Sequence, residues 1–218
     1  MRRDRLSDIE VRTLSAIFKP EMVRRIRDKL PYLFYLAQAE VSRGGKTGME
    51  VGTIREQILI ALLAYVFGEE NIDTGVKITQ PEIDVKVLGI PVSIKTISGQ
   101  RLGGVKVVWT VDWARVNKFV QLYKPKGHII LAHVNWDALG GLYIIPLHVQ
   151  SRVFNMLGRT RYLKIPRRGT NPRGVEISGE AVRKMASDGE TQKMLITWVK
   201  PDRPIPPPYK RWLDYWRA

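Results

Sequence analysis

The chain has 218 residues, 44% of them hydrophobic, which is enough to bury the core of one domain of generous size. Its 36 Lys and Arg outnumber 21 Asp and Glu, and the net charge of +15 favours a polyanionic partner, above all nucleic acid. No apolar run is long enough to span a membrane and no signal peptide or lipidation motif is evident, so we expect a cytoplasmic protein.

The cysteine and histidine content of the chain excludes several kinds of metal site. The sequence contains no cysteine, which rules out a disulfide framework and a zinc site built from thiolates. The histidines are His128, His133 and His148, and they are scattered along the chain. We therefore interpret them as core or surface residues rather than as metal ligands.

Helical patterns dominate the N-terminal part of the chain. Ser7 is predicted to cap a first helix, and Pro20 and Pro31 are each predicted to open a further helix, because proline is favoured at the first helical position. Apolar stripes follow both prolines. We expect these helices to form an N-terminal layer.

A basic loop follows between Arg43 and Met49 and contains three glycines. We predict that Arg43 and Lys46 bind DNA. Met49 has two interpretations: a wedge inserted between base pairs from the minor groove, or a side chain packed under the next helix. The Gly-Lys-Thr within the loop lacks the first glycine of a phosphate-binding loop, which argues against nucleotide binding.

The strongest helical pattern covers residues 53–67 and ends at Gly68. Thr53 and Glu56 fit a capping box, in which Glu56 has a purely structural role. A carboxylate at the start of this helix can also face the element that follows it. Both interpretations of Glu56 remain open from the sequence.

Two alternating runs within residues 80–96 predict a β-hairpin with a two-residue connection at Leu88–Gly89. Counting outward from that connection places Asp84 opposite Ser93 and diagonal to Lys95, within reach of the lysine side chain. A carboxylate and an ammonium group therefore converge on one polar face. Without further context, an ordinary hairpin with one hydrated face has the same pattern.

Beyond the hairpin the pattern indicates a mixed α/β fold. Strands are predicted at 105–109, 128–134 and 142–145, and Asp112 is predicted to cap a helix between the first two. The run at 128–134 is almost entirely apolar, as expected for a strand buried on both faces. Strand, helix and strand in succession are typical of α/β proteins.

A basic segment from Arg159 to Arg173 follows a predicted helix at 147–157. It contains six cations, no acid, and Pro and Gly residues that disfavour regular structure. We interpret it as a groove-reading segment, because the planar fork of arginine binds phosphate or the edge of guanine; a solvated charge run is the alternative. The predicted DNA-binding cations are Arg159, Arg161, Lys164, Arg167, Arg168 and Arg173.

The C-terminal part is predicted to contain a helix at 180–186 and a strand at 194–199. The tail after residue 200 combines several prolines with four aromatic residues, which is unusual for a plain linker. We expect it to dock on its own domain or on a second subunit. Its aromatic residues are Tyr209, Trp212, Tyr215 and Trp216.

The helix with Glu56, the hairpin with Asp84 and the triplet Ser93-Ile94-Lys95 together resemble the core of the PD-(D/E)XK nucleases, over residues 52–145. In that family an Asp opens the hairpin and an acid-x-Lys triplet lies on its second strand. Here Ile83 replaces the usual Pro, and Ser93 replaces the usual second acid. Some members use an acid from the preceding helix, and Glu56 matches that position.

The resemblance implies a restriction-endonuclease-like fold, in which helices flank a mixed β-sheet. The order and spacing of Glu56, Asp84 and Lys95 in a small, basic, cysteine-free chain also resemble a type II restriction endonuclease. That narrower resemblance implies a Mg²⁺-dependent homodimer that cuts double-stranded DNA to blunt ends at a short palindrome of C and G. A cognate DNA methyltransferase would act on the same site without an obligate complex.

We predict one nuclease domain, residues 1–218, with four parts. Residues 1–51 form the helical layer and basic loop, 52–145 the catalytic core, 146–200 the DNA-recognition and dimer elements, and 201–218 the Pro/aromatic tail.

The implied chemistry is metal-assisted hydrolysis of a phosphodiester. A hard divalent cation neutralises charge in the transition state and activates water near neutral pH. Magnesium needs few carboxylates, since substrate oxygens and waters complete its shell, so Glu56 and Asp84 are predicted metal ligands. Lys95 would orient the attacking water, and Ser93 would assist as a fourth catalytic residue.

Two other classes of function remain open. A structure-selective repair or recombination nuclease would share this site but would cut junctions or flaps. A non-catalytic DNA-binding protein would keep the basic loop and Met49 but would not nick DNA.

Overall fold

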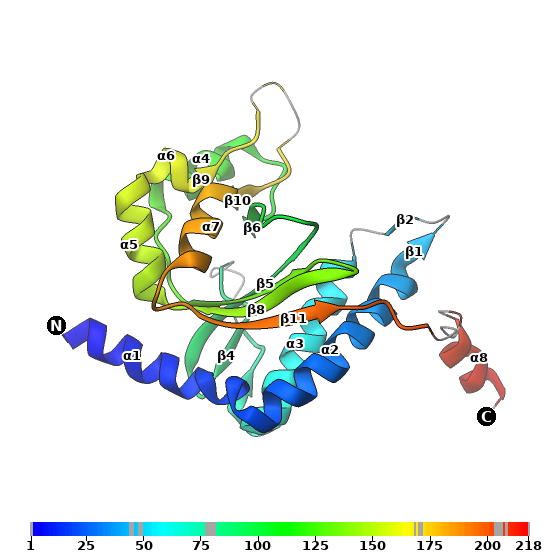
Figure 1. The fold of residues 1–218 in the computed structure, drawn as a ribbon. Coiled ribbons are helices and arrows are strands. Elements are labelled where there is room, and N and C mark those ends of the chain that lie inside the picture. Colours follow the sequence, from blue (N-terminus) through cyan, green and yellow to red (C-terminus); the bar gives the residue numbers. More distant parts are fainter. Residues whose placement is uncertain are drawn as a thin grey trace.

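The computed structural model describes residues 2–43, 46–47, 50–76, 82–167, 169, 172–202, 207 and 209–217, without the side chains of 2–6, 43, 46–47, 210–212 and 214. Its centre is a six-stranded mixed sheet with the order β11-β8-β7-β5-β4-β3 (Figure 1). Strands β5 and β7 are parallel, and the other neighbours are antiparallel. The strands are β3 (Ile72–Asp73), β4 (Val85–Val87), β5 (Ile90–Ser98), β7 (His128–Val134), β8 (Ala138–Ile145) and β11 (Gln192–Trp198).

Helices cover both faces of this sheet. In the view of Figure 1, α2 (Pro20–Val41) and α3 (Val51–Phe67) lie below it, and α1 (Arg2–Leu14) extends toward α5. A second set of elements lies above: α4 (Trp113–Leu122), α5 (Leu147–Leu157), α6 (Arg159–Tyr162), α7 (Gly179–Ser187) and the sheet of β6 (Val105–Val108), β10 (Val175–Ile177) and β9 (Leu163–Lys164). The remaining elements are η1 (Ser15–Phe18), β1 (Ser42–Arg43), β2 (Lys46–Thr47), η2 (Glu69–Asn71) and α8 (Lys210–Arg217).

Strand β7 separates two hydrophobic cores. Ile130, Ala132 and Val134 pack in the core beneath α2 and α3, whereas Ile129 and Leu131 pack in the core formed with α4, α5 and α7. Successive side chains of a strand point to opposite faces, so a strand between two helical layers is buried on both faces and mostly apolar. The predicted strand buried on both faces is confirmed.

The β4–β5 hairpin has the predicted register. Val87 pairs with Ile90 across a two-residue turn in which Leu88 and Gly89 both have positive φ, 51° and 79°. Turns of this kind match the twist of paired strands and require two left-handed residues. The backbone N–H of Asp84 also donates to the carbonyl of Val92 at 3.0 Å, so the pairing reaches Asp84.

The N-terminal helices differ from the prediction. Ser7 lies within α1 rather than before it, and its Oγ lies 3.0 Å from His148 Nδ1. Pro20 opens α2 as expected, but Pro31 lies inside α2 and does not begin a new helix. A proline there removes one helical hydrogen bond, and burial of Leu30, Pro31 and Phe34 offsets that loss.

Two other predicted features can be compared with the structure. Asp112 caps α4, since its Oδ1 accepts from the backbone N–H of Ala114 at 2.7 Å. Part of the predicted basic loop forms a short ladder in which Ser42 pairs with Thr47. Met49 and the side chains of Arg43 and Lys46 lie outside the described residues. No helix within the described ranges is long and apolar enough to cross a membrane.

Candidate active site

Asp84 is the centre of the predicted polar cluster. Its Oδ2 accepts hydrogen bonds from the Ile94 backbone N–H at 2.6 Å, from Lys95 Nζ at 2.8 Å and from Ser93 Oγ at 3.2 Å. These three donors are consecutive on β5, and the hairpin register brings them opposite Asp84. The predicted convergence of Asp84, Ser93 and Lys95 is therefore present.

The Asp84–Lys95 pair is largely withdrawn from water. The side chains of Lys95 and Asp84 are 14% and 16% exposed. Ser93 and Lys95 share one face of β5, whereas Ile94 between them points into the core below. Because water screens this pair only in part, its attraction is stronger than that of an ion pair on the open surface.

Glu56 on α3 belongs to the same cluster electrostatically. Burial raises the pKa of the Glu56 carboxyl, the negative charge of Asp84 raises it further, and the positive charge of Lys95 partly opposes both effects. Charges influence one another in this way only at short range in a screened medium. Helix α3 packs against β5, and the Glu56 carboxyl lies within electrostatic range of Asp84 and Lys95.

The capping-box interpretation of Glu56 is wrong. Helix α3 begins at Val51, and the carbonyl of Glu50 already accepts from the N–H of Ile54. Thr53 is thus the third residue of the helix, and Glu56 lies in its second turn. Since the cap position precedes Thr53, the Glu56 side chain is available for another role.

The donor set fits a hard divalent cation. The hydrogen bonds to Asp84 described above all go to Oδ2. The negative charge of Asp84 raises the pKa of the Glu56 carboxyl, and a cation held between the two groups would relieve that repulsion. Within the described ranges, no cluster of three or more His, Asp or Glu side chains could hold a metal. Glu56 and Asp84 would therefore need oxygen ligands from substrate and water, which is common for Mg²⁺.

Arg55 is a residue of this region that the sequence analysis missed. It is 3% exposed, its Nη1 donates to Ser98 Oγ at 2.6 Å, and its guanidinium lies 5.3 Å from the centre of the Phe34 ring. Burial lowers the pKa of Arg55 to about 10. Arg55 thus ties α3 to the end of β5 beside Glu56. Its spacing of four and eight residues from Leu59 and Leu63, both buried, was the available signal.

Arg159, Arg161 and Lys164 of the predicted groove-reading segment each have a structural partner. Arg159 Nη1 donates to the backbone carbonyls of Val120 and Tyr123. Two further ion pairs use acids that come later in the chain: Arg161 with Glu180, and Lys164 with Glu176 at 3.0 Å. The segment therefore has compensating acids in the folded protein, although its own sequence has none.

The other cations of the segment lie at its far end. Arg167 and Arg173 line a cavity of about 450 Å³ together with Lys164 and Glu176. Gly174 follows Arg173 with φ of 90°, and a Cβ there would lie 2.0 Å from the Val108 carbonyl oxygen. Only glycine fits this close approach, which fixes where the chain enters β10. Arg168 lies outside the described residues.

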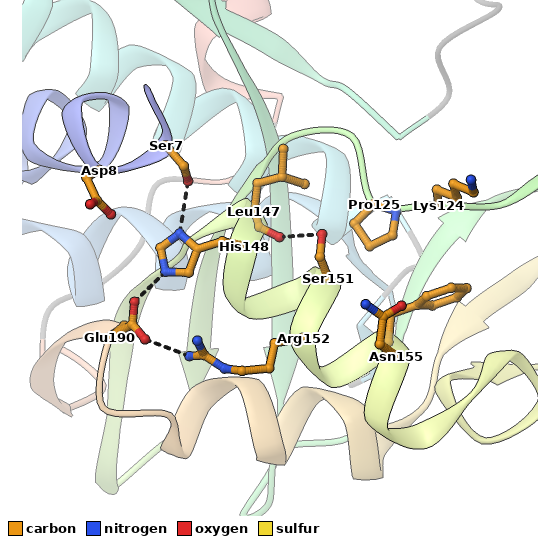
Figure 2. Close-up of a pocket in the computed structure, with 11 residues that line it drawn as sticks. Ser7, Asp8, Lys124, Pro125, Leu147, His148, Ser151, Arg152, Asn155 and Glu190 are labelled. Carbon is orange, nitrogen blue, oxygen red and sulfur yellow. Dashed lines mark hydrogen bonds and ion pairs between the residues drawn. The ribbon is translucent and has the colours of Figure 1, made fainter. Parts of the chain in front are cut away.

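A different cavity, of about 840 Å³, lies between α1 and α5 (Figure 2). His148 bridges Ser7 and Glu190 there, and Glu190 also contacts Arg152 at 2.9 Å. Glu56, Asp84 and Lys95 do not line this cavity. The contact between Ser7 and His148 links α1 to α5. The cavity is separate from the predicted site.

The family model described as "Restriction endonuclease ThaI" matches residues 17–218 of the chain. The chain belongs to the ThaI restriction endonuclease family. The restriction endonuclease predicted from the sequence is thus confirmed at the level of the family. No curated protein matches the chain.

A solved structure supports this placement in the ThaI family. It is described as "Restriction endonuclease in complex with substrate DNA", and it is 47% identical to this chain with a TM-score of 0.86. The match covers 94% of this chain and 99% of that chain. The two molecules therefore share the mixed sheet and its flanking helices over almost their whole length.

Proposed function

We propose that this member of the ThaI family is a type II restriction endonuclease that hydrolyses phosphodiester bonds in double-stranded DNA with the help of Mg²⁺. The proposal is supported by the hydrogen-bonded pair of Asp84 and Lys95, with Glu56 within electrostatic range of both, in a chain of this family. Two carboxylates beside an ammonium group are suited to a metal, a phosphate and a water molecule.

The chain's own residues divide the work in this proposal. Glu56 and Asp84 would hold the cation, which when bound supplies Lewis-acid stabilisation of phosphate charge and a more acidic water. The ammonium group of Lys95 is fixed by Asp84 and would orient the attacking water toward the phosphorus. Ser93 and the Ile94 N–H keep the Asp84 carboxylate in one orientation.

DNA binding is supported by charge and by the relative. The net charge is +15, and the 47% identical structure holds substrate DNA. We propose that Arg167, Arg168 and Arg173 contact DNA, and that Arg43, Lys46 and Met49 of the basic loop contact it as well. In Figure 1, β9 and β10 and the ladder of β1 and β2 lie above the six-stranded sheet. Arg159, Arg161 and Lys164 would contribute mainly by positioning their segment.

The finer features rest on the resemblance to the family. We propose a homodimer that cuts a short palindrome of C and G to blunt ends, with each copy supplying one active site. A methyltransferase of the same specificity would protect the host DNA, and the enzyme would act in the cytoplasm.

Incubation of the protein with a long plasmid and Mg²⁺ tests the proposal. Discrete bands, lost on chelation of the metal, are expected. A smear would favour a nuclease without sequence choice, and uncut DNA would favour a non-catalytic DNA-binding protein. The matched control is Asp84→Asn, which should abolish cleavage and leave DNA affinity within a few-fold; cleavage by this variant would remove Asp84 from the site.

A further inference from the structure

Helix α8 presents an exposed aromatic face. The backbone N–H of Leu213 donates to the Tyr209 carbonyl at 2.9 Å, so the helical turns begin at Tyr209. Tyr209, Leu213 and Trp216 are then spaced as i, i+4 and i+7 on one side of the helix. Tyr209 is 63% exposed and Trp216 is 89% exposed. Figure 1 shows α8 beyond the end of β11, apart from the sheet and its covering helices.

An apolar groove lies between α2 and α3. It has a volume of about 320 Å³, its floor contains the buried Ile26 and Leu30, and its walls include Leu33 and Leu62. At its rim the guanidinium of Arg25 lies 4.9 Å from the centre of the Tyr65 ring, and Tyr65 is 61% exposed. The groove is thus open, apolar inside and cationic at its edge.

We propose that α8 of a second copy of this chain docks in the α2–α3 groove, and that the two copies exchange these helices. Binding of an amphipathic helix in an apolar groove uses anchors at i, i+4 and i+7, which Tyr209, Leu213 and Trp216 supply. Arg25 at the rim is suited to stack on an aromatic ring of the incoming helix. Large aromatic side chains are the commonest anchors at such interfaces.

The course of the chain favours exchange. Pro201 and Asp202 line a cavity of about 480 Å³ together with Asp28, Lys29 and Tyr32 of α2, and Lys29 also lines the groove, so this part of the chain lies beside it. From there α8 stands away from the sheet (Figure 1). A two-fold related copy that presents its own α2 at this place would receive the helix and return its own, giving the self-complementary contact of a C₂ dimer.

This inference rests on the proposed function, because cutting both strands of a palindrome requires two active sites. Exchange of α8 would join those sites through elements outside the catalytic cluster. The dimer would then persist without DNA.

Cross-linking between copies tests the exchange directly, since the chain has no cysteine. Ala61, which lines the groove, is changed to Cys in one copy, and Arg217 on α8 is changed to Cys in a second, differently tagged copy. After co-expression, a short bismaleimide should join the two copies. The control pair is Met156→Cys, on the exposed surface of α5, with Arg217→Cys, which should stay unlinked.

A chain carrying both Ala61→Cys and Arg217→Cys distinguishes the alternatives. A covalent dimer supports exchange. A link formed only within one chain would show that α8 docks on its own groove, and no link in either experiment would show that α8 binds elsewhere; both results overturn the proposal.

Sedimentation without DNA gives a second measurement. Trp216→Ala or Leu33→Arg should weaken the dimer about 30-fold, the loss typical of an interface hot spot. Leu195→Ala, at an exposed position on β11, should leave it unchanged. An unchanged dimer in both groove-related variants overturns the proposal. If the wild-type protein cuts plasmid DNA but no cross-link forms, the exchange fails and the nuclease stands; if it links but never cuts, the nuclease fails.

Discussion

Lys95 Nζ lies 2.8 Å from Asp84 Oδ2, and the two side chains come from opposite arms of the β4–β5 hairpin. Each arm is fixed by backbone pairing, so the contact does not depend on a flexible loop. Asp84 thereby holds the ammonium group of Lys95 in place before any substrate arrives. Preorganised charge of this kind lowers the reorganisation needed in the transition state.

Lys95→Ala should reduce cleavage about 100-fold or more, the usual range when a positioned proton-handling group is lost. DNA affinity should change little, because one partly buried lysine is lost from a strongly basic protein. Plasmid cleavage and a binding titration measure the two effects. Lys86→Ala is the matched control. It removes another cation of the same hairpin, and the ion pair of Lys86 with Asp73 is exposed. Normal turnover of Lys95→Ala would refute the assignment.

Glu56→Gln should raise the melting temperature of the metal-free protein while lowering cleavage. The folded pKa of Glu56 is raised above its usual 4.5 by burial and by Asp84. As pH rises above 4.5, the unfolded chain releases this proton first, so the stability contributed by Glu56 falls until the folded pKa is passed. Above that pH the wild type carries the full free-energy cost of keeping the Glu56 carboxylate charged in a partly buried position beside Asp84. The change to glutamine removes that cost.

Melting curves from pH 4 to pH 8 test this prediction, with Gln57→Glu as a charge control at the adjacent exposed position. The advantage of Glu56→Gln should grow with pH. A variant that is less stable at every pH and cuts normally would return Glu56 to a structural role.

Leu88→Asn should stabilise the protein by ~1 kcal/mol. Leu88 has φ of 51°, a conformation that costs most side chains free energy and that asparagine tolerates well in this turn. Its side chain is 49% exposed, so little burial is lost. Urea unfolding should show a higher midpoint with an unchanged slope. Leu88→Ala keeps the unfavourable conformation, and an equal gain from alanine would contradict the explanation.

His128→Gln should flatten the pH dependence of stability. Burial lowers the pKa of His128 below its usual 6.5, against a smaller opposing effect of Glu10. His128 Nδ1 accepts from the Leu147 N–H at 3.2 Å, so Nε2 carries the proton and donates to Glu10 Oε2 at 2.9 Å. Below pH 6.5 the unfolded chain is protonated first, and stability falls as pH drops through the folded pKa. The free energy of unfolding is measured against pH for the wild type and for His128→Gln. Equal slopes for the two proteins between pH 7 and pH 5 would exclude this role of His128.

Arg173→Ala and Arg159→Ala should separate DNA contact from structure. Loss of Arg173 should weaken DNA binding and lower the slope of log K against log salt by about one. Loss of Arg159 leaves the carbonyls of Val120 and Tyr123 without their donor and should cost about 1–3 kcal/mol of stability. Salt titrations and urea unfolding measure these effects. A reduced salt slope for Arg159→Ala alone would reverse the assignment.

Local chemistry explains what was predictable. The Leu88–Gly89 connection set the hairpin register, and that register placed Asp84 beside Ser93 and Lys95. The apolar run of β7 revealed a strand covered on both faces. Each of these features follows from a few neighbouring residues, so the sequence is sufficient for them.

Tertiary contacts explain what was not predictable. Pro31 stays within α2, where it is buried by its surroundings. Arg55 is buried because it donates a hydrogen bond to Ser98 on β5 and packs on the Phe34 ring of α2. The acids that pair with Arg161 and Lys164 lie on later segments. Partners far apart along the chain cannot be read from periodicity.

The parallel pairing of β5 with β7 affects how the site assembles. Hairpin closure between β4 and β5 is local and fast, but β7 joins β5 only after the chain has passed through β6 and α4. Pairings of high sequence separation carry a larger loop-closure entropy and slow the search for the native state. The Asp84–Lys95 contact can therefore form early during folding, whereas the sheet that buries it is completed late.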